Sequence, residues 1–145
     1  MAKKDALLTF SENQALTDTA LATSAITLST GYNTLSDLGG GKQIYLQITV
    51  DVAAANVTDI TFTLESDDNL DFSSATTHYS SGAIVAANLT AGATAVLVAL
   101  PIQKTYQKYL GVRYTFSDAG TATFTAILTD QPNVNTLYAD NITIS

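Results

Sequence analysis

The segment IYLQITV, residues 44–50, decides the fold class of this chain. Its apolar and polar side chains alternate strictly: Ile44, Leu46, Ile48 and Val50 form one set, and Tyr45, Gln47 and Thr49 form the other. Apolar residues at every second position share one face of an extended chain, whereas a helix would need spacings of three and four. The segment therefore predicts a strand with one buried face.

The same period of two recurs along the chain. It is clear in residues 60–64, 110–116 and 122–128, and residues 95–100 are apolar on both faces, which predicts a deeply buried strand. Weaker candidates are residues 20–28, 77–84 and 137–144, and turn signals stand at residues 39–41, 66–69, 91–92 and 117–120. About eight short antiparallel strands at this spacing predict an all-β sandwich or barrel.

One connection looks like a hairpin. Phe116 and Ala122 flank a short loop that contains Gly120, so we expect residues 112–128 to form two paired strands. Residues 52–55 allow one helical turn at most, and no other segment has a helical period.

Length and composition indicate one folded domain. The 145 residues suffice for a single core, and 46% hydrophobic against 13% charged residues is too apolar for a disordered chain. We assign residues 1–145 to one β-sandwich domain, with residues 1–12 as an extended N-terminal arm and residues 131–145 as a C-terminal tail.

The charge and the lack of special segments exclude several partners. A formal net charge of −7 repels a phosphate backbone, so we expect no nucleic acid. No apolar stretch is long enough for a membrane helix and the N-terminus has no export signal, so we expect no membrane and no export. The chain has no cysteine, which excludes disulfides and thiolate metal sites.

An acidic segment, LESDDNLDFSSA at residues 64–75, raises the question of a calcium site. Asp67, Asn69 and Asp71 have the spacing that opens a calcium loop, but Phe72 and His78 stand where an EF-hand needs glycine and glutamate. We therefore interpret the segment as a turn whose Asp and Asn side chains bind their own backbone, with Phe72 folded back on the core. A calcium loop of another kind stays as the alternative; we expect no metal and no cofactor.

We found no convincing catalytic pattern. His78 has Ser73, Ser80 and Ser81 near it in the sequence, but no G-x-S-x-G elbow is present. The LGGGK run at residues 38–42 lacks the spacing of a phosphate loop. The sequence predicts that the protein is not an enzyme.

The segment PIQKTYQKYLGVRY, residues 101–114, is the chemically distinctive surface candidate. It holds three of the six basic residues and interleaves them with tyrosines. Tyr and Arg are typical of protein interfaces, and the acidic balance of the chain disfavours nucleic acid. The predicted contact residues are Lys104, Tyr106, Lys108, Tyr109 and Arg113.

Ordered blocks of this sequence resemble the small capsid cement, or decoration, proteins of tailed bacteriophages. The blocks are FSENQALTDTALATSAITL at residues 10–28, IYLQITVDVAAANVTDITFTLESDDNLDFSSAT at 44–76, SSGAI at 80–84 and LPIQKTYQKYLGVRYTFSDAGTATFTAILTD at 100–130. Within them, LESDDNLDF after a strand and a Pro-initiated loop leading to KYLGVRY occur together and in order. The tail at residues 131–145 and the loop at residues 39–41 do not match.

The resemblance implies a jelly roll and a structural role in the virion. Such a protein binds the outside of the phage head and bridges neighbouring major capsid subunits, which stabilises the expanded shell. Multivalent bridging favours a homo-oligomer, and we expect a trimer ahead of a dimer. The chain would be made in the host cytoplasm.

A second function class fits the same composition. A carbohydrate-binding or host-attachment β-sandwich of a phage tail or fibre would use aromatic side chains, and the tyrosines are available although tryptophan is absent. A hydrolase that uses His78 with a serine, or the carboxylates of Asp67, Asp68 and Asp71, is a third reading.

Overall fold

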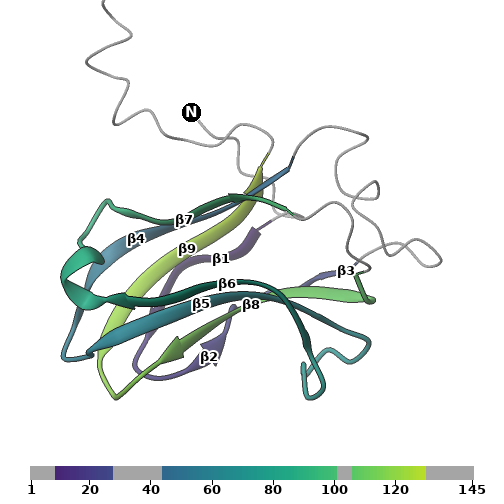
Figure 1. Cartoon of the computed structure of the whole chain (residues 1–145), viewed down its shortest axis with the longest axis horizontal. Helices are drawn as coiled ribbons and strands as arrows, with labels where there is room; N and C mark the ends of the chain where they lie inside the picture. The colour runs from purple at the N-terminus through teal and green to yellow at the C-terminus, as the bar shows by residue number, and fades with distance from the viewer. Residues whose placement is uncertain (1–8, 28–43, 101–105, 130–145) are drawn as a thin grey trace, which may run out of the picture.

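The computed structural model describes residues 9–27, 44–100 and 106–129 (Figure 1). These residues form strands and one short 3-10 helix, η2 (Ala86–Asn88). The strands are β1 (Thr9–Leu16), β2 (Ala20–Leu21), β3 (Ile26–Thr27), β4 (Tyr45–Ala55), β5 (Asp59–Asp67), β6 (Thr76–Val85), β7 (Thr94–Ala99), β8 (Tyr109–Phe116) and β9 (Thr121–Thr129). They confirm the all-β prediction.

Two antiparallel sheets pack face to face as a sandwich (Figure 1). Sheet A has the order β1-β9-β4-β7, and sheet B has the order β2-β8-β5-β6, with β3 also pairing with β8. Because β2 and β3 pair with the same strand, they act as two pieces of one edge. Every other connection except that between β5 and β6 crosses from one sheet to the other, which is the jelly-roll arrangement.

The core lies between the sheets and is centred on aromatic rings. Phe62 of β5 meets Phe124 of β9 edge-on at 5.0 Å between ring centroids, and Tyr114 of β8 stacks on Phe124 at 5.2 Å. Burial raises the pKa of Tyr114, and its hydroxyl shares a 2.6 Å hydrogen bond with Ser11 Oγ of β1. A buried hydroxyl needs such a partner, so this bond ties the two sheets together inside the core.

The alternating strands are confirmed. Leu46, Ile48 and Val50 of β4 are at most 1% exposed, as the opening segment predicted. Residues 60–64, 110–116 and 122–128 fall within β5, β8 and β9, and the weaker candidate at residues 77–84 falls within β6. Residues 52–55 extend β4 and make no helical turn.

The predicted hairpin at residues 112–128 is wrong. Strand β8 pairs with β5, β2 and β3, whereas β9 pairs with β1 and β4. The loop between them therefore crosses the sandwich. It passes so close to the β4–β5 connection that a Cβ on Gly120 would lie 2.6 Å from the Ala55 carbonyl oxygen. A turn signal specifies a reversal of the chain but not the sheet in which the next strand pairs.

Two further expectations need correction. Strand β7, predicted to be deeply buried, is the edge of sheet A, and Leu97 is 38% exposed. Residues 9–12, assigned to an arm, begin β1, which pairs with β9. The rest of that arm, the tail at residues 131–145, the glycine run at residues 39–41 and the weak candidate at residues 137–144 lie outside the described residues.

Candidate functional site

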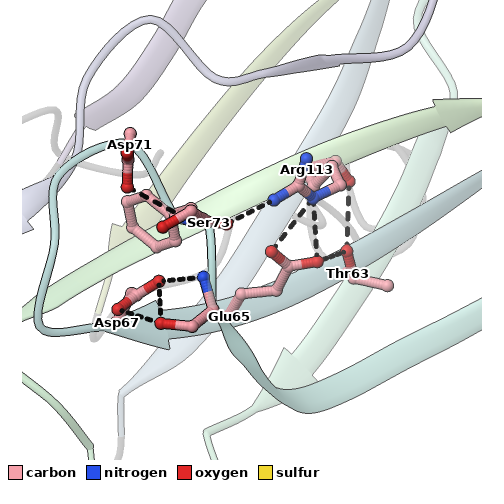
Figure 2. Close-up of polar contacts among 8 residues, drawn as sticks. Thr63, Glu65, Asp67, Asp71, Ser73 and Arg113 are labelled. Atoms are coloured by element: carbon pink, nitrogen blue, oxygen red, sulfur yellow. Dashed lines mark hydrogen bonds and ion pairs between the residues drawn. The ribbon is translucent and has the colours of Figure 1, made fainter.

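The loop that connects β5 and β6 folds over the outer face of sheet B, and Asp67 at the end of β5 organises it. Asp67 Oδ1 accepts a hydrogen bond from the Asn69 N–H at 3.0 Å, and Oδ2 accepts one from the Ser74 N–H at 2.8 Å. Burial raises the pKa of Asp67, but these bonds and that from the Ser74 hydroxyl outweigh it, so the pKa is lowered. Figure 2 shows the carboxylate within the turn. The carboxylates of Asp67 and Asp71 thus hold the backbone of the turn, as predicted for the Asp side chains, whereas the Asn69 side chain donates to Asp67 Oδ1 at 3.5 Å.

Phe72 anchors this loop at a place that the sequence did not indicate. Its side chain is 5% exposed, yet it does not belong to the core between the sheets. It packs on Gly111 of β8, where an added Cβ would lie 2.6 Å from the Phe72 ring. Because alternate residues of a strand face opposite ways, Gly111 points outward while Leu110 and Val112 point into the core. Phe72 therefore covers the outer face of sheet B, which corrects the expected packing on the core.

Arg113 fastens the same loop from the side (Figure 2). Its Nε lies 3.0 Å and 3.1 Å from the two carboxylate oxygens of Glu65, and its Nη2 donates to the Phe72 carbonyl oxygen at 3.3 Å. Thr63 Oγ1 donates to the same carboxylate at 2.9 Å. The Glu65 side chain is 8% exposed and that of Arg113 is 30% exposed. The guanidinium is thus engaged within the chain.

A groove lies between this loop and the stretch from β2 to β3. It has a volume of about 620 Å³. Its walls include Leu21, Ala25, Thr27, Leu70, Phe72 and Tyr109. Leu70, in the loop that connects β5 and β6, is 62% exposed. The groove offers an apolar and hydroxyl-bearing surface that is wide enough for side chains of another molecule.

The predicted contact residues divide into different environments. Tyr109 lines the groove, and Lys108 Nζ lies 5.2 Å from the centroid of the Tyr109 ring, a cation–π distance. Lys108 is exposed, and its N–H donates to Asp68 Oδ1 at 3.4 Å. These two residues form the exposed part of the predicted contact. Lys104 lies outside the described residues.

Tyr106 does not belong to that surface. Its side chain is 0% exposed, and burial raises its pKa to about 12. Its ring meets the ring of His78 at 4.5 Å between centroids. Tyr106 is therefore a core residue, which the alternation of Tyr and Lys in the sequence did not reveal.

His78 is joined to a serine that was not among the expected ones. Its Nε2 lies 2.7 Å from Ser66 Oγ, and the Gln107 N–H donates to the same hydroxyl at 3.0 Å. Ser66 is 0% exposed, so a substrate has no access to its hydroxyl. The contact ties β5, β6 and the segment just before β8 together, which is a structural role.

The described residues contain no group of three His, Asp or Glu side chains placed to hold a metal ion. Nor does any helix among them have the length and apolar character that crossing a membrane requires.

Sequence reasoning missed the far wall of the groove. The stretch from β2 to β3 carries no chemical motif, and its pairing with β8 brings it beside Tyr109. The one available signal was Leu70 itself, an apolar side chain at the tip of an acidic turn.

A comparison with protein families identifies the class to which this jelly roll belongs. Residues 10–132 match the Bbp16 family. The chain is therefore a member of the Bbp16 family, which is phage-related. No curated protein matches the chain.

Proposed function

We propose that this protein is a non-enzymatic structural component of a phage virion. It binds the outer surface of the head and bridges neighbouring major capsid subunits, and this stabilises the expanded shell. The contact surface includes Leu70, Lys108 and Tyr109 at the groove on sheet B. The protein works as a homo-oligomer with the major capsid protein as its partner.

One observation carries the proposal: the two blocks most specific to the cement-protein resemblance meet in one place. LESDDNLDF supplies the loop, and KYLGVRY supplies the β8 surface on which the loop packs. The contact of Phe72 with Gly111 and the bond from Arg113 to the Phe72 carbonyl hold the blocks together. Two blocks about forty residues apart in the sequence thus build a single exposed surface, as a contact site requires.

The surface is suited to protein contact. The Tyr109 ring offers an amphipathic area with few rotamers, Lys108 offers a cation, and Leu70 offers an exposed apolar tip, a mixture typical of interfaces. The Arg113–Glu65 ion pair and the Asp67 turn fix the shape of this surface in the unbound protein, which lowers the entropic cost of binding.

The first experiment is quantitative mass spectrometry of purified virions. We expect a molar ratio of this chain to the major capsid protein near one, or at a fixed simple fraction of it. A few copies per particle would identify a tail or fibre part, and absence of the chain from virions would refute the proposal.

A second experiment tests the surface itself. Shells stripped of this chain are incubated with the wild-type protein or with the double variant Lys108→Ala, Tyr109→Ala, and bound protein is measured by co-sedimentation. We expect the double variant to bind at least about tenfold more weakly, because interface tyrosines carry a large share of binding energy. Thr115→Ala, an exposed change on the same strand, is the matched control. Equal binding of all three proteins would remove this surface from the proposal.

The groove also supports a second candidate function, attachment to carbohydrate. Its walls combine the Tyr109 ring with the hydroxyls of Thr23, Ser24 and Thr27, a set suited to stacking on a sugar ring and binding its hydroxyls. A screen of immobilised glycans separates the two candidates. Binding that Tyr109→Ala abolishes, together with a low copy number in virions, would favour attachment.

A further inference from the structure

The groove on sheet B has the size and the apolar lining to hold part of a peptide. Two of its lining residues, Phe72 and Gly111, are buried and pack on each other, whereas Leu70 is 62% exposed. A volume of about 620 Å³ accommodates a few side chains but not a whole domain. The groove therefore fits one short segment of a partner, with an apolar side chain that packs beside Leu70 and Phe72.

The wall that the β5–β6 loop forms is acidic. Residues 65–71 contain four carboxylates, and among the described residues the cations bonded to this segment are Lys108, through its N–H, and Arg113. The guanidinium of Arg113 is already paired within the chain. Asp68 and Asp71 are both exposed, and Figure 2 shows Asp71 on the loop. An excess of negative charge beside the groove attracts a cationic partner and repels an anionic one.

The opposite wall has used its backbone donors within the chain. The N–H groups of residues 22–24 donate in turn to the Val112 carbonyl oxygen at 2.8 Å, to Gln14 Oε1 at 3.0 Å and to the Phe10 carbonyl oxygen at 2.8 Å. The Thr23 hydroxyl also donates to Gln14 Oε1, at 3.2 Å. A hydroxyl oxygen that has donated its proton can still accept a hydrogen bond. This wall therefore mainly offers acceptors, which suit a partner that carries donors.

We propose that the groove binds a short cationic segment of the major capsid protein, in which an arginine or a lysine stands next to an aliphatic side chain. The aliphatic side chain packs against Leu70 and Phe72, and the cationic group donates to the exposed carboxylates and to hydroxyl oxygens of the opposite wall. Arginine suits the site best, because its guanidinium has five donors and no acceptor. The inference rests on the proposed function, since the shell supplies the segment.

The sign of the partner's charge is tested by removing the two exposed carboxylates. In the double variant Asp68→Asn, Asp71→Asn the amide oxygens can still accept the bonds from the Lys108 and Ser73 N–H groups, so the loop keeps its shape. At about 50 mM salt we expect stripped shells to bind this variant about fivefold more weakly than the wild type, because two exposed ion pairs are lost. The difference should shrink at about 0.5 M salt, which screens exposed charges.

A second double variant, Asp18→Asn, Asp59→Asn, is the matched control. It removes the same net charge, but both residues lie next to the β8–β9 loop, at the opposite end of β8 from Tyr109. We expect it to bind shells within about twofold of the wild type, because charges that far from the groove are screened. A control that loses as much affinity as the first double variant would assign the effect to net charge and overturn the inference.

Overlapping peptides of the major capsid protein identify the segment. We expect the peptides that bind in fluorescence anisotropy to carry an arginine or a lysine beside an aliphatic residue, and to shift the amide NMR signals of Ser24 and Leu70. Replacing that cation by glutamine should weaken binding about as much as the Asp68→Asn, Asp71→Asn variant does. The two changes together should cost little more than either alone, because they remove the same interaction.

The outcomes separate this inference from the proposed function. Full binding of the Asp68→Asn, Asp71→Asn variant to shells at low salt would overturn the inference and leave the proposed function intact. No binding of the wild type to shells would refute the proposed function, and with it the shell as the source of the segment. Binding of neutral glycans without any peptide would favour the carbohydrate candidate instead.

This chain itself contains a segment of similar chemistry. Residues 1–8, MAKKDALL, carry Lys3 and Lys4 close to two leucines, so a peptide of this sequence belongs in the same assay. We expect it to bind more weakly than the best capsid peptide. Tighter binding would assign the groove to the chain's own N-terminal segment and contradict the assignment to the shell.

Discussion

Individual side chains at the end of β5, next to the β5–β6 loop, stabilise the fold. Glu65 and Asp67 are almost fully buried carboxylates, and each is compensated, Glu65 by the Arg113 guanidinium and Asp67 by backbone N–H groups. A buried charge without such partners is costly. Arg113, expected at an interface from its residue type, is thus largely committed to its own chain.

Replacing Arg113 tests that role. In Arg113→Ala the Glu65 carboxylate loses its charged partner, and we expect the free energy of unfolding to fall by about 2 kcal/mol. Urea denaturation measures the change. Lys108→Ala, which removes an exposed cation near the same strand, should alter stability by less than about 0.5 kcal/mol. Equal effects of the two variants would mean that the ion pair contributes nothing.

The lowered pKa of Asp67 predicts a stability change in acid. The folded-state pKa lies below the ordinary value of 3.8, so the stabilising contribution is complete above that value and is lost as the pH falls through the folded-state pKa. The free energy of unfolding, measured from pH 6 down to pH 2, should therefore fall more steeply for the wild type than for Asp67→Asn. Parallel profiles would contradict the assignment.

At the scale of elements, the β5–β6 loop and β8 behave as one unit. The Phe72 ring packs on Gly111 of β8, the Arg113 guanidinium donates to the Phe72 carbonyl oxygen, and the Asp67 carboxylate holds the turn. Together these contacts build one wall of the groove. Gly111 is essential to this packing because no other residue leaves room for the Phe72 ring.

Gly111→Ala should disrupt the packing of the β5–β6 loop on β8. The added Cβ would lie 2.6 Å from the Phe72 ring, so the loop has to shift, and we expect a loss of about 1–3 kcal/mol in urea denaturation. Phe72→Ala removes the clashing ring, and Gly111→Ala should cost much less in that background. Equal costs in both backgrounds would show that Phe72 is not the obstacle.

At the scale of the whole molecule, the homo-oligomer of the proposed function would carry several copies of the contact surface. A second contact then forms at high effective concentration, so moderate individual contacts give durable binding. The proposed bridging of capsid subunits depends on this multivalency.

The sequence by itself determined the strands, because a period of two in side-chain polarity is a local property that burial of one face imposes. The runs around Ile48, Phe62 and Phe124 and the Asp67 turn were readable for this reason. Only the tertiary structure decided the partner of each strand, because the loop at Gly120 permits either a hairpin or a crossing of the sandwich. The tertiary structure also makes β7 an edge of sheet A, buries Tyr106 and brings Phe72 onto Gly111. These contacts join residues far apart in the chain, and no local pattern encodes which surfaces will meet.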